Sequence, residues 1–249
     1  MINQFNQSAI YTASQCMQLY KYVYVDKLES GEPLSADIEF GSAIHLGIEN
    51  MFKGNDYEIA FLSFWTNSQT KDLKYGRFCW DELKDQGLKL LTRFDRLHRH
   101  KFMPIHIEEK ITIKEGDLEI YGTPDLVCMY QDQATVLDFK TSGFRYPKEK
   151  IDCALQLYVY SKLVNLMYNA NVSQIGYVVF VKGPEPSIQT PLTKEVNKKE
   201  IDFHYNQFIM KCKEIQKANL ETRNYASCIK GNFVCPYFKH CYGKEPKSG

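Results

Sequence analysis

The first hundred residues place apolar side chains at intervals that fit the period of a helix. Four segments show this pattern and predict helices: residues 8–25, 35–54, 57–68 and 77–100. The second segment is the clearest, because Ser35 can cap its start and Gly54 marks its end. The N-terminal part of the chain, residues 1–101, is therefore expected to be mostly helical.

The pattern changes after residue 102 to short segments rich in β-branched residues. Four such segments predict a meander of strands: residues 103–113, 117–122, 124–131 and 134–141. A helix at 148–170, a buried strand at 173–183 and an amphipathic helix at 193–220 then complete the expected core. Residues 221–249 form an irregular tail. With neither a repeat nor a linker, this order predicts one mixed α/β domain over residues 1–249.

The composition and charge of the chain disfavour two classes of protein, general nucleic-acid coat proteins and membrane-spanning proteins. The 249 residues carry 31 basic and 30 acidic side chains, a net charge of +1, which argues against a general nucleic-acid coat but allows a local basic channel. No apolar run approaches the roughly 18–20 residues of a membrane span, and the first residues lack the order of a signal peptide. We therefore expect a soluble, cytoplasmic protein that does not enter a membrane.

Two basic runs are candidate contacts to a nucleic-acid backbone, although such runs are more often solvated faces. They comprise Arg93, Arg96, Arg99 and Lys101 in the first run, and Arg145, Lys148 and Lys150 in the second.

A charged pair interrupts the apolar strand 134–141. Alternation along a strand places Asp138 and Lys140 on one face, with Leu137 and Phe139 on the other. In the preceding strand, Asp125 comes at the start, so a hairpin would bring both carboxylates to one point. Two carboxylates with the backbone carbonyl of Phe139 suit Mg²⁺ or Mn²⁺, and the lysine can neutralise charge on a reacting phosphate. The motif alone also fits a solvated structural ion pair.

Two helices supply further polar residues. His45 shares a stripe with small residues on the helix 35–54, where it is a metal ligand or a surface histidine. Gln156 and Tyr160 lie four residues apart on the helix that follows the Asp-x-Lys strand, so they face the same way. An amide and a phenol there can bind a phosphate or a base, although Tyr160 equally fits the core.

The chain has eight cysteines, and its first residues do not resemble a secretion signal, so disulfide bonds do not readily explain them. A disulfide framework is disfavoured, and four of them are expected to be small core residues: Cys79, Cys128, Cys153 and Cys212. The remaining ones are Cys16 near the N-terminus and a cluster of Cys228, Cys235 and Cys241 in the last 22 residues.

The motifs GSAIHLGIE, GTPD, VLDFKT and QLYVY, in this order, resemble those of RecB-type nucleases of the PD-(D/E)XK superfamily. The resemblance runs from about residue 8 to 241 and implies a restriction-endonuclease-like core, a mixed central sheet flanked by helices. It implies these roles: His45, Asp125 and Asp138 as metal ligands, Lys140 as the catalytic lysine, and Gln156 with Tyr160 as DNA contacts. A glutamate often precedes the first aspartate in this family. Glu109 is the candidate here, with Glu108 as its rival.

The resemblance extends to the cysteines. A subset of these nucleases, including AddB-type and CRISPR-associated exonucleases, holds a [4Fe-4S] cluster with one N-terminal cysteine and three from the tail. Cys16, Cys228, Cys235 and Cys241 resemble that set, which would close the tail on the N-terminal helix. Six residues separate Cys228 from Cys235 where the family usually has two, so zinc, or no ligand at all, remains an alternative.

The function that the resemblance implies is a metal-dependent DNA nuclease, an exonuclease at single-stranded or unwinding ends in recombination, repair or defence. It would hydrolyse a phosphodiester by in-line attack of a metal-activated water. A helicase or recombination protein is the expected partner besides DNA. The alternatives are a non-cleaving DNA-end adaptor and a restriction-type or structure-specific endonuclease. An intact Asp/Asp/Lys set disfavours the adaptor, and the tail cysteines disfavour the restriction enzyme.

Overall fold

The computed structural model describes residues 3–230 and 233–244. The chain forms two compact units. The core unit consists of residues 33–111 and 122–204, and the terminal unit takes its described residues from 1–32, 112–121 and 205–249. Within the described residues, no helix has both the length and the apolar character needed to cross a membrane.

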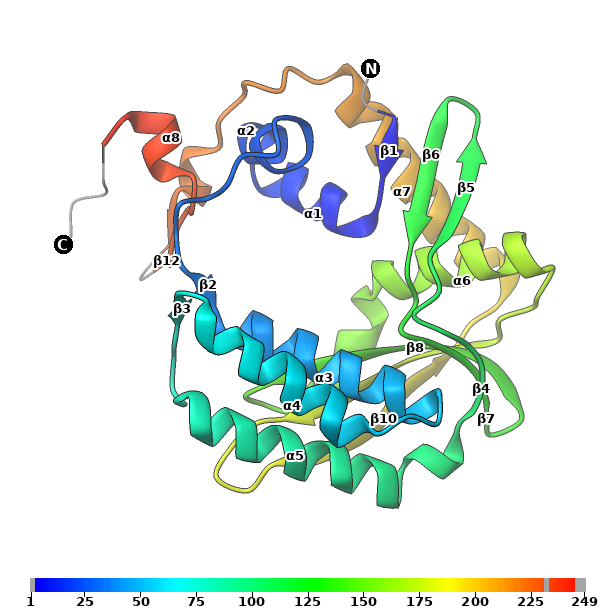
Figure 1. Ribbon diagram of the computed structural model, residues 1–249. Coiled ribbons are helices and arrows are strands. Elements are labelled where there is room, and N and C mark those ends of the chain that lie inside the picture. Colours follow the sequence, from blue (N-terminus) through cyan, green and yellow to red (C-terminus); the bar gives the residue numbers. More distant parts are fainter. Residues whose placement is uncertain (1–2, 231–232, 245–249) are drawn as a thin grey trace. The chain divides into compact units, whose positions relative to one another are not determined.

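A five-stranded mixed sheet is the centre of the core unit (Figure 1). Its strands, in spatial order, are β10 (Ser187–Glu195), β9 (Gln174–Val181), β8 (Gln133–Ser142), β7 (Leu126–Tyr130) and β4 (Met103–Ile107). The β8 and β9 strands are parallel, and the other neighbours are antiparallel. The crossover between the two parallel strands contains α6 (Leu155–Tyr168), as parallel pairing requires a long connection.

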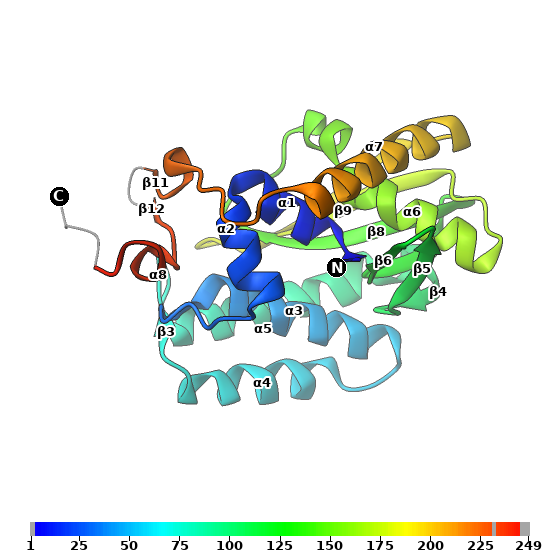
Figure 2. The ribbon, with the colours of Figure 1, turned by 90° about the horizontal axis from the view of Figure 1, so that it is seen from above.

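Three helices cover one face of this sheet: α3 (Ala36–Phe52), α4 (Tyr57–Asn67) and α5 (Trp80–Leu97). Figure 2 shows α4 outside α3, farther from the strands. Leu137 and Phe139 of β8 belong to the apolar core beneath these helices. Asp138 and Lys140 alternate with them and share the opposite face with α6, whose Gln156 reaches Lys140. The predicted division of faces along this strand is confirmed. Two short strands, β2 (Leu34–Ser35) and β3 (Leu73–Lys74), pair beside the helices.

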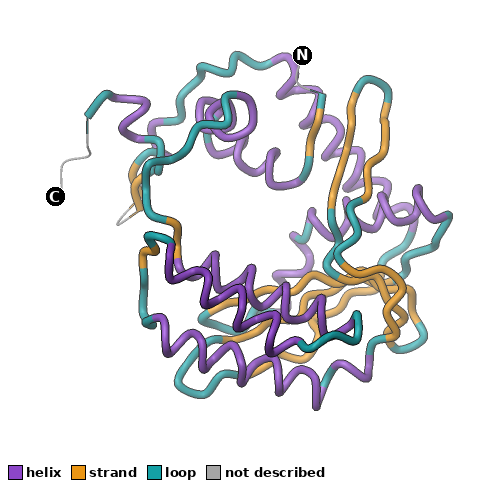
Figure 3. The backbone as a smooth tube through the Cα atoms, viewed as in Figure 1, coloured by secondary structure: helices purple, strands orange, loops and turns teal. Residues whose placement is uncertain are grey.

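The terminal unit combines segments that lie far apart in the sequence. A three-stranded sheet has the order β1 (Gln4–Phe5), β6 (Leu118–Gly122) and β5 (Ile111–Glu115), and Figure 3 shows the turn that joins the last two. Its helices are α1 (Gln7–Gln15), α2 (Met17–Tyr20) and most of α7 (Lys198–Lys217), which begins in the core unit. The tail contributes β11 (Ile229–Lys230), β12 (Phe233–Val234) and α8 (Phe238–Tyr242).

The predicted order of elements is largely confirmed, and the departures have local causes. The helix expected at 8–25 is interrupted because Cys16 adopts an extended backbone, with φ −164° and ψ 127°. The helix expected at 148–170 begins as a 3₁₀ segment and becomes α6 only after Ala154. The single strand expected at 103–113 is wrong. It divides into β4 and β5, which belong to different sheets, because Glu108 has a positive φ of 49°. The predicted meander is therefore also wrong, since β5 and β6 pair in the sheet of the terminal unit, and among its consecutive strands only the last two, β7 and β8, are neighbours in the central sheet. Strand β10 was not anticipated.

Candidate metal centre and active site

Three acidic residues lie side by side in one row across the neighbouring strands β4, β7 and β8. Leu126, the first residue of β7, pairs with the last residue of β4 on one side and with β8 on the other. The next residue along each strand is an acid, so the following row contains Glu108, Asp125 and Asp138. The Glu108 N–H donates to the Asp125 carbonyl at 3.2 Å, which continues the pairing of the row. Because neighbouring residues across strands have Cβ atoms about 5 Å apart, the register itself gathers the three carboxylates.

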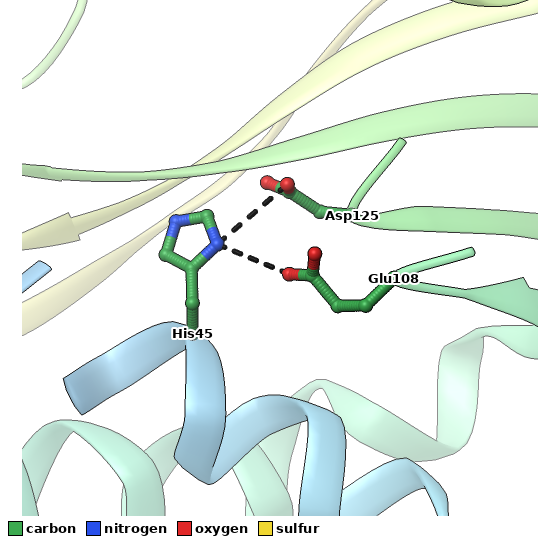
Figure 4. Close-up of side chains that lie close together, drawn as sticks. All are labelled: His45, Glu108 and Asp125. Atoms are coloured by element: carbon green, nitrogen blue, oxygen red, sulfur yellow. Dashed lines mark hydrogen bonds and ion pairs between the residues drawn. The ribbon is translucent and has the colours of Figure 1, made fainter. Parts of the chain in front are cut away.

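His45 extends from α3 toward this row (Figure 4). Its Nδ1 lies 3.3 Å from Glu108 Oε1 and 3.6 Å from Asp125 Oδ1. Its Nε2 is 2.9 Å from the carbonyl oxygen of Phe139. One ligand atom from each of His45, Glu108 and Asp125 falls within 4.8 Å of the other two. One imidazole nitrogen and two carboxylates can therefore face a single cation. Asp138 lies beside this group, close enough for its charge to act on Asp125.

The donor set fits a divalent cation such as Mg²⁺ or Mn²⁺. Asp125 is 7% exposed and Asp138 is 1% exposed, so two carboxylates are removed from water side by side. Asp138 Oδ2 has no hydrogen-bond donor among the described residues. Lys140 Nζ is 2.7 Å away, an ion-pair distance without the geometry of a hydrogen bond. Buried carboxylates with unused oxygen lone pairs are the ligands that hard cations prefer.

The charges of this cluster shift the pKa values of its members. Burial raises the pKa of Asp125 well above its usual range, and the charge of Asp138 raises it further. Burial alone would lower the pKa of His45. The hydrogen bond to Glu108 and the charges of Asp125, Glu108 and Asp138 outweigh burial, and the pKa of His45 rises to about 9. In the absence of a metal, a protonated His45 therefore supplies the positive charge that the acids require.

A polar chain connects Lys140 to helix α6. Lys140 Nζ is 3.4 Å from Gln156 Oε1, and Gln156 Nε2 donates to the Tyr160 hydroxyl at 2.9 Å. Tyr160 in turn packs on the glycine of the GTPD motif. A Cβ at Gly122 would lie 2.6 Å from Tyr160 Cε1, so only glycine permits this approach. The predicted pair on α6 therefore faces the Asp-x-Lys strand.

An open cleft of about 860 Å³ lies beside the centre. The stripe predicted on α3 lines it, comprising Gly41, Ser42, His45 and Glu49, and Lys140 lies on its other side. A Cβ at Gly41 would be 3.3 Å from Thr141 Oγ1, so a small residue allows α3 to approach the end of β8 closely. The cleft gives a substrate access to His45, Glu108 and Lys140.

The glutamate in the cluster is Glu108, and the preference for Glu109 was wrong. The positive φ of Glu108 ends β4 and turns its side chain toward His45. Glu109 is exposed and makes a 2.7 Å ion pair with His106 instead. Nothing in the IEEKI sequence marks the break, because both glutamates fit a continuous alternating strand equally well.

Some residues of the two predicted basic runs lie in the same groove of the core unit, and the others do not. Arg93, Arg96 and Arg145 line one groove of about 960 Å³ between α5 and the loop that joins β9 to β10. Arg99 instead forms a 3.3 Å ion pair with Asp95. The other predicted contacts, Lys101, Lys148 and Lys150, are exposed and do not line this groove.

Four cysteines line one cavity of about 420 Å³ in the terminal unit: Cys16, Cys228, Cys235 and Cys241. Burial raises the pKa of the Cys235 thiol, and the other three thiols add to this effect. All four are free thiols. The remaining cysteines divide: Cys128 and Cys212 are buried as predicted, whereas Cys79 and Cys153 are exposed because they lie at the ends of helical segments.

The chain matches one protein family and is similar in fold to a solved structure. Residues 4–242 match the PD-(D/E)XK nuclease superfamily. A crystal structure from Eubacterium rectale, of a protein described as a candidate exonuclease, has a TM-score of 0.62 at 14% identity, covering 99% of this chain and 91% of that chain. The structure of SSO0001 has a TM-score of 0.34 at 13% identity, with coverages of 92% and 96%, and carries no argument. No curated protein matches the sequence. The mixed α/β fold and the match over nearly the whole chain show that it belongs to the PD-(D/E)XK nuclease superfamily.

Proposed function

We propose that this chain is a divalent-metal-dependent deoxyribonuclease that removes nucleotides from DNA ends, in recombination, repair or defence. The observation that carries the proposal is the convergence of His45, Glu108 and Asp125 beside the buried Asp138 and the ammonium group of Lys140. The likeness to a structure described as a candidate exonuclease supports end-directed cleavage over the adaptor and endonuclease alternatives.

The residues that would hold Mg²⁺ or Mn²⁺ are His45, Glu108 and Asp125, with Asp138 and the carbonyl of Phe139 beside them. When bound, the cation acts as a Lewis acid on the phosphate and makes water a better nucleophile at neutral pH. His45 must lose the proton that it shares with Glu108 before its Nδ1 can serve as a ligand. Asp125 accepts the Phe139 N–H at 2.5 Å through Oδ2, which holds its carboxylate in place and leaves Oδ1 facing His45.

Lys140 would stabilise the charge that develops on the phosphate. Burial alone would lower its pKa, but the charge of Asp138 outweighs burial and raises the pKa, so the ammonium form persists at neutral pH. In its protonated form Lys140 donates hydrogen bonds, so we assign it the role of a donor. Gln156 and Asp138 hold this ammonium at the edge of the cleft, where it can orient the attacking water or bind a non-bridging oxygen.

The direct test is digestion of end-labelled single-stranded and duplex DNA with and without Mn²⁺. We expect Lys140→Ala to abolish cleavage without loss of folding, whereas Lys198→Ala, which removes an exposed lysine of the core unit, should cut at the wild-type rate. A covalently closed single-stranded circle should resist digestion that degrades the same strand when linear. Undiminished cutting by Lys140→Ala would refute the catalytic assignment, and cutting of the circle would favour an endonuclease.

We also propose that the four cysteines of the terminal unit bind a [4Fe-4S] cluster. Four thiols around one cavity match the ligand number of such a cluster. In zinc sites of proteins the ion is typically about 2.3 Å from each thiolate. The cavity of about 420 Å³ is larger than a single zinc ion would require. Protein purified without oxygen should contain iron and sulfide and absorb in the visible range, and Cys235→Ser should lose both. Zinc as the metal present, or an unchanged variant, would contradict the cluster.

A further inference from the structure

The groove between α5 and the β9–β10 loop is lined by the same two segments of the chain as the active-site cleft. Gly143 and Lys182 line the cleft, while Arg145 and Pro184, each two residues further along the chain, line the groove. The two cavities therefore lie along the same pair of segments, which follow the parallel strands β8 and β9.

The groove carries a strong positive charge. Its ionisable residues are Lys89, Arg93, Arg96 and Arg145, with Glu185 as the single acid among them. Arg96 and Arg145 make no hydrogen bond or ion pair with any residue in the described part of the chain. Arg93 Nη1 donates to the Pro186 carbonyl at 2.7 Å, so its guanidinium is already oriented in the groove. Unpaired arginines in a groove are the side chains that bind phosphate groups.

An exposed aromatic residue lies between the two cavities in sequence. Phe144 is 80% exposed and separates Gly143, which lines the cleft, from Arg145, which lines the groove. Its loop is held in place at both ends. The Phe144 N–H donates to Ser142 Oγ at 3.1 Å, and two hydrogen bonds of 2.8 and 2.9 Å join the Tyr146 backbone to the side chain of Gln189. Single exposed apolar residues are common on protein surfaces. Phe144 differs from the others in its position, because its anchored loop joins a residue of the cleft to a residue of the positively charged groove.

We propose that Phe144 stacks on a base of single-stranded DNA while Arg96 and Arg145 bind its phosphates, so that the strand leaves the active site through this groove. The proposal rests on the nuclease function and specifies its substrate as single-stranded. In a duplex, the bases stack on one another and leave no face for Phe144. Aromatic rings that alternate with arginines are the combination by which proteins hold unpaired strands.

The test measures binding in EDTA, where no cleavage occurs, by the anisotropy of a fluorescein-labelled dT₂₀ strand and of a labelled duplex. We expect Phe144→Ala to weaken binding of dT₂₀ about tenfold, the effect of one lost base stack, with little change for the duplex. Phe144→Trp should restore the affinity. The matched control is Phe203→Ala, which removes a phenylalanine of the core unit that is 59% exposed and should bind as the wild type. Equal affinities of Phe144→Ala and the wild type for dT₂₀ would overturn the stacking assignment, and an rU₂₀ strand that binds tenfold tighter than dT₂₀ would overturn the choice of DNA.

The phosphate contacts have a separate signature in the salt dependence. Each lost contact to a single strand should reduce the slope of log affinity against log salt by about 0.7. Arg96→Ala and Arg145→Ala are each expected to show this reduction. Arg99→Ala removes the same charge from a residue paired with Asp95 and should leave the slope unchanged. Equal slopes for all three variants would show that only net charge matters and would refute the groove.

A small chromogenic substrate separates this inference from the nuclease function itself. The p-nitrophenyl ester of thymidine 5′-monophosphate is too short to reach from the active site along the groove. We expect Phe144→Ala and Arg96→Ala to hydrolyse it as the wild type does, with Mn²⁺ present, while they digest dT₂₀ more slowly. If the wild type hydrolyses neither substrate, the nuclease function fails. If the variants lose both activities equally, the groove is not a strand path.

Discussion

The charge balance at His45 makes the metal-free protein sensitive to pH in a direction opposite to that of most carboxylate clusters. The folded protein raises the pKa of His45 from 6.5 to about 9. A base whose pKa is raised by folding stabilises the protein fully below pH 6.5, and this stabilisation is lost as the pH rises through about 9. We therefore expect the metal-free protein to become less stable between these two values.

The magnitude follows from the two pKa values. At about 1.36 kcal/mol for each pH unit, the gap between 6.5 and about 9 corresponds to a loss of about 3 kcal/mol in the free energy of unfolding. Because the His45 side chain is partly open to the cleft, solvent screening makes this an upper value. Burial and Asp138 also raise the pKa of Asp125, and ionisation of this buried acid lowers stability with rising pH as well.

Urea denaturation in EDTA at pH 6.5 and pH 9.5 measures the effect. The wild type should lose part of its stability at the higher pH, and His45→Gln should be less stable than the wild type at pH 6.5 but nearly equal to it at pH 9.5. His106→Gln, which removes a histidine outside the cluster, is the control and should follow the wild type. If His45→Gln loses as much stability between the two pH values as the wild type, the loss does not come from deprotonation of His45.

Three further predictions concern packing and metal binding. Gly122→Ala should lower the free energy of unfolding by about 1–3 kcal/mol, because its Cβ would overlap the Tyr160 ring, and it should also reduce the rate of DNA cleavage by displacing the support of Lys140. Gly87→Ala should lower the free energy of unfolding by a similar amount, because its Cβ would overlap the Phe61 ring, but it should leave the cleavage rate of the folded enzyme unchanged. Chemical denaturation measures the stability of both variants, and a cleavage assay distinguishes them. Mn²⁺ at about 100 times its Kd should raise the free energy of unfolding of the wild type by about 2.7 kcal/mol, which thermal unfolding can measure. If the cluster binds no cation, Mn²⁺ should leave the melting temperature unchanged.

The sequence was most informative where the relevant contacts are local. Asp138 and Lys140 are two residues apart in one strand, and Asp125 lies on the adjoining strand of a hairpin. Strand alternation and a short connection were therefore enough to predict that these three side chains converge. The helical positions of Gln156 and Tyr160 followed in the same way, because α6 directly follows β8 in the crossover.

Features that depend on distant pairing or on a single backbone angle were not predictable. Glu108 reaches His45 through the register of β4 against β7 and through one left-handed residue, and neither leaves a mark in the sequence. The groove joins α5 to two loops that are about 50 and 90 residues further along the chain, so its arginines appeared as two unrelated runs. The exposure of Cys79 was missed because it caps α5 instead of lying within an element.

Calorimetric titration of Mn²⁺ into the metal-free protein measures whether His45 of α3 and the acids Glu108 and Asp125 form a cation site. We expect the wild type to bind Mn²⁺ and Glu108→Gln to bind it at least about tenfold more weakly, since one carboxylate ligand is lost. Glu109→Gln removes the neighbouring charge, which lies outside the cluster, and should bind as the wild type. Equal affinities for all three proteins, or a loss confined to Glu109→Gln, would show that Glu108 is not a ligand of the cation.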